Sequence, residues 1–345
     1  MITPAAMLST MVPHEPLPRR AALLGGVALL AGCTTEMTPR GPVVTAAEVG
    51  DAVFVMRDGA RLPYRAWLPE GPEAAVVLAL HGFNDSRDAW ELPAPAFRAA
   101  GIAFYAPDQR GFGAAPGRGL WAGADAMADD AADMVAALRA RHPGRRLFLM
   151  GESMGGAVLM RLATRGGAPE VEGYILLAPA VWGRAKMNPF MQGALWLAST
   201  LVPGLEVTSR PPPGVKITPT DNVEALRRLS ANPLTVKSTR FDTLSGLVDL
   251  MDEALAAAPA FKARSLFLYG MKDDLVPPAA TRTIWRAMGP GPRRVLYPEG
   301  YHLLMRDLGR AGPIGDAIAW IADPSGVLPS GGEARVAAWL ATDAG

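Results

Sequence analysis

Hydrophobic residues along this chain fall into short runs that alternate with longer stretches of helical periodicity. From about residue 52 onward, six runs are short and almost continuously apolar, which is typical of strands in the interior of a sheet. They are AAVVLALHG, GIAFYAPD, RRLFLMG, GYILLAPA, SLFLYG and RRVLYP. Strands that alternate with helices favour a mostly parallel sheet with helices on both faces. The pattern therefore predicts an α/β fold.

The segments around these runs predict the remaining elements. The stretch AVFVMRDGARLPYRAWLP has the pattern of a β-hairpin with its turn at Asp58-Gly59. The helix AVLMRLATR is expected to be amphipathic. Helices are expected near residues 88–100, 123–142, 153–165, 243–258 and 279–287, and a last pair is separated by DPSGVLPSGG.

The alternation of strands and helices breaks near Val181. Residues 182–239 are rich in apolar side chains without a strand pattern, and they contain PPPG at residues 211–214 and one helical stretch, NVEALRRLS. We interpret this segment as a helical cap inserted into the sheet order. A chain of 345 residues is long for one core, which agrees with a core that carries an insertion. The predicted division is a core of residues 52–180 and 240–345, with a cap at residues 181–239.

The first residues of the chain have the pattern of an export signal. Arg19-Arg20 precede an apolar run, AALLGGVALLA, which is too short to span a bilayer and is followed by small residues. We predict a signal peptide at residues 1–32 and a polar tether at residues 33–51. The twin arginine also resembles a Tat signal, so the sequence leaves export by the Sec or the Tat route open.

The stretch LAGC, which ends at Cys33, resembles the lipobox of bacterial lipoproteins. The resemblance implies cleavage before Cys33 and lipidation of its thiol, which would anchor the protein on the periplasmic side of a bacterial cell envelope. Thr34 at the next position is not the aspartate associated with retention in the inner membrane, which favours the outer membrane. A plain signal peptide, or an uncleaved anchor with an incidental cysteine, is the alternative.

Composition and charge exclude few functions. The chain has 34 basic and 33 acidic residues, a formal net charge of +1 and no long basic run, so nothing in it indicates nucleic-acid binding. Its single cysteine excludes an intrachain disulfide, and its four histidines form no metal-binding pattern. We therefore expect no nucleic-acid partner, no metal and no cofactor. The oligomeric state is not predicted.

The motif GESMGG lies between a predicted strand and a predicted helix. Its pattern Gly151-x-Ser153-x-Gly155 is typical of a tight turn that holds a serine hydroxyl at the carboxyl edge of a sheet. Acyl transfer through serine also needs a base, an acid that orients the base, and donors for the oxyanion. Asp273 follows the strand SLFLYG, with a second aspartate beside it, and His302 follows the strand RRVLYP. The serine, one of the two aspartates and the histidine are therefore predicted at one edge of the sheet.

These motifs resemble those of α/β-hydrolases of the monoacylglycerol lipase and lysophospholipase group, which is similar to the S33 serine aminopeptidases. The resemblance extends from about residue 53 to residue 320. It rests on five motifs in matching order, LHGFND, PDQRGFG, GESMGG, GMKDDLVP and GYH. It implies an α/β-hydrolase fold with an inserted helical cap, and hydrolysis through an acyl-enzyme.

The resemblance also implies a role for five residues. Ser153 matches the nucleophile, Asp273 the acid and His302 the general base. The spacing from the preceding glycine and the following proline favours Asp273 over its neighbouring aspartate. The backbone N–H groups of Phe83 and Met154 match the oxyanion donors.

Other interpretations of residues in these motifs are structural. His81 is expected to shape the oxyanion loop, and Asp108 and Arg110 to brace a loop through a local ion pair or backbone hydrogen bonds. Glu152 is assigned no role. Ser153 alone is also compatible with a helix N-cap, and His302 with a packed core residue. Asp274 is the alternative to Asp273 as the acid.

The cap is the sequence feature that bears on the substrate. Its apolar residues are predicted either to line a groove for an acyl chain or to pack the cap against the core. They are Met187, Phe190, Met191, Trp196 and Leu197. The leading hypothesis is a lipid-anchored serine ester hydrolase that cleaves monoacylglycerol or lysophospholipid.

Two further hypotheses are carried forward. A general carboxylesterase or a proline-type serine peptidase uses the same framework, and a peptidase would need a carboxylate such as Asp249 or Glu253 to hold the amino terminus of its substrate. A non-catalytic envelope lipoprotein on a hydrolase fold is the remote alternative. A serine at the turn, in place of aspartate, disfavours the dehalogenases and epoxide hydrolases of this fold.

Overall fold

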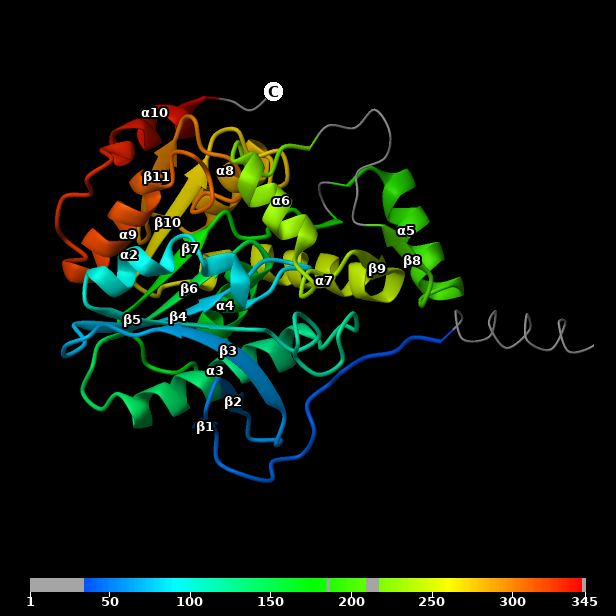
Figure 1. Cartoon of the computed structure of the whole chain (residues 1–345). Coiled ribbons are helices and arrows are strands. Elements are labelled where there is room, and N and C mark those ends of the chain that lie inside the picture. The colour runs from blue at the N-terminus through cyan, green and yellow to red at the C-terminus, as the bar shows by residue number, and fades with distance from the viewer. Residues whose placement is uncertain (1–33, 185–186, 209–216, 343–345) are drawn as a thin grey trace, which may run out of the picture.

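One large sheet forms the centre of the molecule (Figure 1). The computed structural model describes residues 34–184, 187–208 and 217–342. Within these residues the sheet has nine strands in the order β1-β2-β3-β5-β4-β6-β7-β10-β11. In chain order their bounds are β1 Glu48–Val49, β2 Val53–Val55, β3 Arg61–Trp67, β4 Ala75–Leu80, β5 Ile102–Pro107, β6 Leu147–Glu152, β7 Gly173–Leu177, β10 Ser265–Gly270 and β11 Arg293–Tyr297.

Strand direction divides this sheet into two parts. The pairs β1–β2, β2–β3 and β3–β5 are antiparallel, and the hairpin predicted around Asp58-Gly59 forms β2 and β3. From β5 through β4, β6, β7 and β10 to β11 every pair is parallel. The six apolar runs of the sequence form these six parallel strands. The predicted α/β class with a mostly parallel sheet is therefore confirmed.

The helices of the core follow the predicted order with one difference. Their bounds are η1 Arg87–Trp90, α2 Ala94–Ala99, α3 Ala124–Arg141, α4 Met154–Thr164, α7 Phe241–Ala257, η3 Ala258–Ala260, α8 Pro278–Ala287, α9 Ala311–Ala322, η4 Gly332–Arg335 and α10 Val336–Ala341. The segment predicted as one helix near residues 88–100 is divided into η1 and α2. Pro93 separates the two because proline has no N–H to donate to a continuing helix.

Helices cover both faces of the sheet, so the parallel strands are buried. In β4 the side chains of Val76 and Leu78 belong to one apolar layer, and those of Ala75 and Val77 to the other. This alternation follows from the two-residue repeat of a strand. Side chains of α3, α4, α7 and α8 fill the first layer, and those of η1, α2 and α9 fill the second.

Helix α4 differs from the amphipathic helix that its sequence predicts. Eight of its 11 residues are buried, and Arg161 is among the few that reach the surface. The helix contacts β6 on one side and α3 and α7 on the others. A helix enclosed by three elements is apolar nearly all round. The same contacts hold the first residue of α4, and so the turn at Ser153, in place.

In the described part of the segment predicted as a cap, the structure has two helices and a small sheet. Its elements are α5 Pro189–Leu201, β8 Glu206–Thr208, α6 Val223–Ala231 and β9 Ser238–Arg240. The strands β8 and β9 pair antiparallel, which the sequence pattern did not predict. Figure 1 shows α6 near the carboxyl ends of the parallel strands and α5 at the side of the molecule. The PPPG stretch lies outside the described residues.

The segment predicted as a tether lies against the body from its first described residue. Arg40 forms ion pairs with Asp129 at 3.3 Å and Asp130 at 3.5 Å, and it also contacts Asp133. Further along, β1 joins the sheet at its edge. The predicted signal peptide and Cys33 lie outside the described residues. Across the part of the chain that the structure describes, no helix is both long and apolar enough to cross a membrane.

Candidate active site

Ser153 lies on the turn between β6 and α4 in a strained backbone conformation. Its φ and ψ are 52° and −116°, a region that residues other than glycine rarely adopt and that costs on the order of 1–3 kcal/mol. Gly155 makes this turn possible, because a Cβ atom there would lie 2.3 Å from the carbonyl oxygen of Leu80. The Ser153 side chain makes no capping hydrogen bond to α4. The geometry is therefore that of a tight strand-to-helix turn, in which Ser153 makes no side-chain cap for the helix.

His302 is paired with Asp273 in the loops that follow β11 and β10. The His302 Nδ1 lies 2.8 Å from Asp273 Oδ2, and both residues are buried. The other oxygen of Asp273 accepts hydrogen bonds from the backbone N–H groups of Leu275 and Val276, both at 2.8 Å. Asp274 instead accepts a hydrogen bond from the backbone of a cap residue, at 3.3 Å. Of the two adjacent aspartates, the structure thus places Asp273 against the histidine.

The surroundings of His302 favour its protonated form. Burial disfavours the imidazolium and lowers its pKa, but the charge and hydrogen bond of Asp273 raise it, and Glu152 adds to this effect. The net result is a pKa raised above the ordinary value for histidine. An imidazole whose protonated form is stabilised in this way can accept a proton from a neighbouring group.

The loop after β4 lies beside Ser153. A Cβ atom at Gly82 would be 3.4 Å from the Ser153 Cβ, so the two segments are in contact. Gly82 and Ser153 are followed by Phe83 and Met154, the residues whose N–H groups are predicted as oxyanion donors. Met154 is the first residue of α4, where backbone N–H groups lack helical partners.

His81 and Gln109 hold this loop in place. The His81 Nδ1 donates to the carbonyl of Gly82 at 2.7 Å, and its Nε2 accepts from the backbone N–H of Gln109 at 3.1 Å. The side chain of Gln109 returns a hydrogen bond to the carbonyl of His81 at 2.7 Å. Both ring nitrogens of His81 are therefore engaged, in agreement with the predicted structural role.

Asp108 and Arg110 do brace loops, but with separate partners. Asp108 accepts backbone hydrogen bonds from Arg87 and Ala114, each at 2.7 Å, and pairs with the Arg87 guanidinium. Arg110 is 3% exposed and pairs with Asp130 at 2.8 Å and with another aspartate of the hairpin turn. The local ion pair between Asp108 and Arg110 considered from the sequence is not the arrangement observed. Each residue connects its loop to a distant element.

Sequence reasoning missed a buried cluster of charges next to Ser153. Glu152, which was assigned no role, contacts Arg306 at 2.5 Å, and Arg306 contacts Asp85 at 2.7 Å. All three residues are buried. These residues are distant in the sequence and belong to no single motif. Only the folded structure, which brings them into contact, reveals the cluster.

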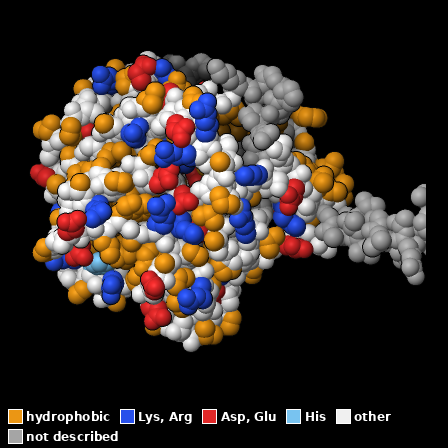
Figure 2. All heavy atoms as spheres, viewed as in Figure 1, with side chains coloured by type: hydrophobic (Ala, Val, Ile, Leu, Met, Phe, Trp, Pro, Cys, Tyr) orange, Lys and Arg blue, Asp and Glu red, His pale blue; other side chains and the backbone are white. Residues whose placement is uncertain are grey.

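The apolar residues predicted to contact substrate lie mainly on the outside of α5. Phe190 is 83% exposed, Trp196 67% and Met191 42%, whereas Leu195 on the inner side is 8% exposed. Met187, just before the helix, is partly buried. Figure 2 shows hydrophobic side chains gathered at this edge of the molecule. These residues are not packed against the core.

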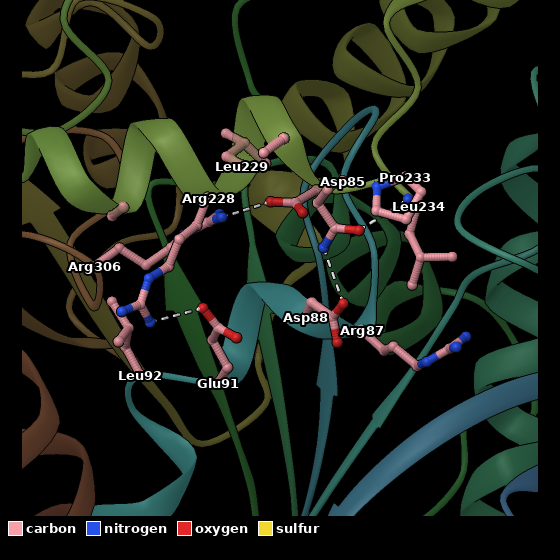
Figure 3. Close-up of a pocket in the computed structure, with 13 residues that line it drawn as sticks. Asp85, Arg87, Asp88, Glu91, Leu92, Arg228, Leu229, Pro233, Leu234 and Arg306 are labelled. Carbon is pink, nitrogen blue, oxygen red and sulfur yellow. Dashed lines mark hydrogen bonds and ion pairs between the residues drawn. The ribbon is translucent and has the colours of Figure 1, made fainter.

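A cavity of about 700 Å³ lies between η1 and α6, close to the ion pair of Asp85 and Arg306 (Figure 3). Its lining combines apolar side chains with charged and polar pairs, such as Glu91 and Arg228 at 3.4 Å and Asp88 and Asn232 at 2.9 Å. Asp85 and Arg306 form part of its wall. Among the described residues, no group of three or more His, Cys, Asp and Glu side chains could hold a metal ion.

Fold and site together define the class of protein. A mostly parallel sheet carries a serine on a strained strand-to-helix turn after β6, and a buried aspartate–histidine pair follows β10 and β11 at the same edge. This is the organisation of an α/β-hydrolase.

Comparison with known proteins agrees with this class. The family model of the serine aminopeptidases S33 matches residues 71–309. The monoacylglycerol lipase of Mycolicibacterium smegmatis is 25% identical over 266 residues, which cover 76% of this chain and 93% of that protein. The crystal structure of Paleococcus ferrophilus monoacylglycerol lipase has a TM-score of 0.63 at 22% identity, covering 76% of this chain and 99% of that chain. A soluble variant of Saccharomyces cerevisiae monoglyceride lipase has a TM-score of 0.66 at 20% identity, covering 85% and 100%.

The chain therefore belongs to the serine aminopeptidase S33 family of α/β-hydrolases. It is an enzyme, a serine hydrolase of the carboxylic ester class.

Proposed function

We propose that Ser153, His302 and Asp273 form a catalytic triad that hydrolyses a carboxylic ester through an acyl-enzyme. The observation that carries the proposal is the buried hydrogen bond of 2.8 Å between His302 and Asp273, on the sheet edge that also presents the strained Ser153. Asp273 engages the Nδ1 of the histidine, so the Nε2 is the nitrogen available to take the serine proton. Asp273 holds the imidazole in that tautomer and stabilises its charged form.

The reaction follows from these positions. The Ser153 Oγ attacks the ester carbonyl carbon while its proton passes to His302 Nε2, and the N–H groups of Phe83 and Met154 stabilise the oxyanion. Collapse of the intermediate breaks the bond to the alcohol, which leaves with the proton from His302. A water molecule then repeats the sequence on the acyl-enzyme and releases the fatty acid. His302 must be neutral to begin, so kcat/KM falls as pH drops below its raised pKa.

The proposed substrate is a monoacylglycerol or a lysophospholipid. The similarity to a monoacylglycerol lipase over most of both chains supports this choice. The exposed apolar face of α5 also supports it, because Phe190, Met191 and Trp196 offer a surface for an acyl chain or for the lipid layer that contains the substrate. Met187, which is partly buried beside the same helix, completes the proposed contact set.

We also propose that the protein is anchored through a lipid on Cys33 in a bacterial cell envelope, with the outer membrane favoured. Thr34, the next residue, lies at the cap, where its carbonyl accepts a hydrogen bond from Arg240 at 3.1 Å. Arg240 ends β9, which pairs with β8 just after α5. An anchor attached at Cys33 would therefore lie near the exposed apolar helix. This arrangement would turn α5 toward the membrane.

The experiment that tests the function is hydrolysis by a fragment that begins at Thr34, with Ser153→Ala compared with the unchanged fragment. We expect hydrolysis of long-chain monoacylglycerol or lysophosphatidylcholine to exceed that of short p-nitrophenyl esters and of a dipeptide amide. Ser153→Ala is expected to lower kcat by at least about a thousandfold, whereas Ser199→Ala on α5 leaves it unchanged. A Ser153→Ala variant that keeps most of its turnover would overturn the triad.

The same substrates separate the alternatives. Activity confined to short esters would favour a general carboxylesterase, and activity on the amide a proline-type peptidase. The two carboxylates considered for a peptidase are already paired, Asp249 with Arg184 at 2.6 Å and Glu253 with Arg161 at 3.3 Å. A non-catalytic lipoprotein would not react with a serine-directed phosphonate, so labelling of Ser153 excludes that alternative.

A further inference from the structure

Arg306 is the centre of a buried cluster of charges next to the proposed triad. It is 6% exposed, and its two terminal nitrogens contact Asp85 at 2.7 Å and Glu152 at 2.5 Å. Asp85 and Glu152 are themselves 6% and 2% exposed. The proposed mechanism uses none of the three residues. A buried cationic group between two buried carboxylates therefore needs an explanation of its own.

Each member of the cluster belongs to a different segment of the site. Glu152 is the residue immediately before Ser153, and Asp85 lies in the loop after β4 that packs against the serine. Arg306 lies four residues after His302 in the loop that follows β11. One guanidinium thus joins the segments that carry the nucleophile, the oxyanion donor and the base.

The chemistry of the guanidinium suits this joining role. Its planar group addresses two carboxylates at once in a fixed geometry, which an ammonium group cannot reproduce. Removal of Arg306 would leave Asp85 and Glu152 buried without a counter-charge, a strongly unfavourable state. The backbone of Arg306 is also held from the cap, because its carbonyl accepts a hydrogen bond from the Asn222 side chain at 2.9 Å.

We propose that Arg306 is a positioning residue that sets the relative placement of the Ser153 turn and the His302 loop through its contacts with Glu152 and Asp85. This inference rests on the roles proposed for Ser153 and His302. It adds to them the group that holds the two reacting side chains at the correct separation.

The cluster also affects the pKa of His302. The pH dependence of kcat/KM is therefore a measurement that a purely structural role of Arg306 would leave unchanged. The charged groups around the imidazole are Asp273 from the β10 loop, Glu152 from β6 and Arg306 on its own loop. Asp85 contacts Arg306, and Asp307 accepts a hydrogen bond from the backbone N–H of Tyr301, the residue before His302. The negative charge of Glu152 raises the pKa of His302, and the positive charge of Arg306 lowers it.

The two ends of one ion pair are therefore expected to shift the pH profile in opposite directions. In Arg306→Met, the acid limb of kcat/KM is expected to move to higher pH by about 0.5–1 unit, because the unpaired Glu152 stabilises the imidazolium. In Glu152→Gln it is expected to move to lower pH, because that negative charge is gone. In Arg306→Met, kcat is expected to fall by about 10- to 100-fold with KM within about twofold, since misplacement affects the reaction more than binding.

Two further variants control for loss of stability. Arg110→Met removes an arginine that is likewise buried and likewise paired with two carboxylates, but that is not among the groups acting on His302. It is expected to lower the melting temperature without moving the pH profile. Arg306→Lys keeps the charge but contacts one carboxylate at a time, so kcat is expected to be only partly restored while the pH profile returns toward that of the unchanged protein.

The cavity beside Arg306 permits a chemical rescue (Figure 3). Arg306 forms part of the wall of this cavity of about 700 Å³, so a side chain shortened by Arg306→Ala leaves a path by which a small cation can reach the two carboxylates. Guanidinium chloride at non-denaturing concentration is expected to raise the kcat of Arg306→Ala severalfold. Sodium chloride at the same ionic strength is expected not to.

These measurements separate the two proposals. If Ser153→Ala keeps its turnover, the proposed function fails and the role of Arg306 fails with it. If Ser153→Ala is inactive, shifts of opposite sign in Arg306→Met and Glu152→Gln support the positioning role. Unchanged profiles, or shifts of the same sign, overturn that role alone. Should Arg306→Met fail to fold, Glu152→Gln decides by a shift of the acid limb to lower pH, and Arg306→Lys by a loss of kcat with little shift of the pH profile.

Discussion

The ends of the parallel strands and the helix α5 both carry side chains that the sequence marks as functional, but their surroundings are opposite. At the strand ends, Asp273 and His302 are buried and hydrogen-bonded before any substrate arrives. On α5, Phe190 and Trp196 are largely exposed and only Leu195 faces inward. The first region is preorganised for a reaction, and the second is open for contact with something outside the molecule.

This difference follows from what each kind of function requires. Catalysis depends on groups held at fixed distances and shielded from water, so strain and buried charge are tolerated where surrounding elements enforce them. Contact with a lipid chain or layer depends on apolar area and not on fixed geometry. The strand ends should therefore be sensitive to single-atom changes, whereas the outer face of α5 should tolerate substitution.

The largest effect is expected from Asp273→Asn. This variant keeps the shape of the side chain but removes the charge that stabilises protonated His302, so kcat should fall by about 10³- to 10⁴-fold. Steady-state hydrolysis of the preferred ester measures the loss. Asp274→Asn is the matched control, because that carboxylate contacts a cap backbone N–H instead of the histidine. A greater loss in Asp274→Asn than in Asp273→Asn would reverse the assignment of the acid.

Next in size is the effect of Gly155→Ala on folding. The new Cβ would lie 2.3 Å from the carbonyl oxygen of Leu80, so β4 and the turn must move apart. We expect the free energy of unfolding to fall by about 2–4 kcal/mol, with loss of activity. Denaturant unfolding measures this change. Gly166→Ala, where no atom lies within 4 Å of the added Cβ, should be close to neutral.

Substitutions on the outer face of α5 should leave the stability of the protein unchanged but weaken its binding to lipid. Trp196→Ser and Phe190→Ser are expected to change the free energy of unfolding by less than about 0.5 kcal/mol, since both side chains already lie in water. Binding of the fragment to neutral lipid vesicles should weaken severalfold, with short-ester hydrolysis unchanged. Leu195→Ser, on the buried side of the same helix, should instead destabilise the protein by about 2 kcal/mol or more. Vesicle binding that is insensitive to Trp196→Ser would remove the contact role proposed for this face.

The smallest expected effect is the contribution of His302 to the pH dependence of the free energy of unfolding. Its folded-state pKa is raised, so the paired imidazolium contributes stability below the unfolded pKa, and this contribution is lost as pH rises through the folded value. In His302→Gln, the pH dependence of the free energy of unfolding should therefore be weaker between about pH 6 and 8 than in the unchanged protein. Equal slopes in the two proteins would show that the pairing does not stabilise the fold.

Local patterns predicted the sheet and the candidate triad because both depend on neighbouring residues. Continuous apolar runs indicate strands buried on both faces, and the glycines around Ser153 indicate a turn that other residues cannot form. The position of His302 after a strand places it at the same edge as Asp273. The order of these motifs was sufficient to predict which loops meet.

Other features had no local signal. The pairing of β8 with β9 joins two segments of three residues each, too short for a periodic pattern. The sequence of α4 predicted one buried face and one exposed face. Because β6, α3 and α7 surround the helix, most of its residues are buried instead. The exposure of Phe190 and Trp196 depends on how far α5 lies from the body, so an apolar helix in the sequence could equally have been core.

The sequence by itself determined the fold class, the order of the strands along the chain and the residues available for acyl transfer, because each is written in spacing and residue type over fewer than about twenty positions. The tertiary structure alone decided that α5 presents its apolar side to the outside and that Arg306 lies between Glu152 and Asp85. These outcomes depend on contacts between residues up to 221 positions apart. Such contacts are set by the packing of whole elements, and no local pattern records them.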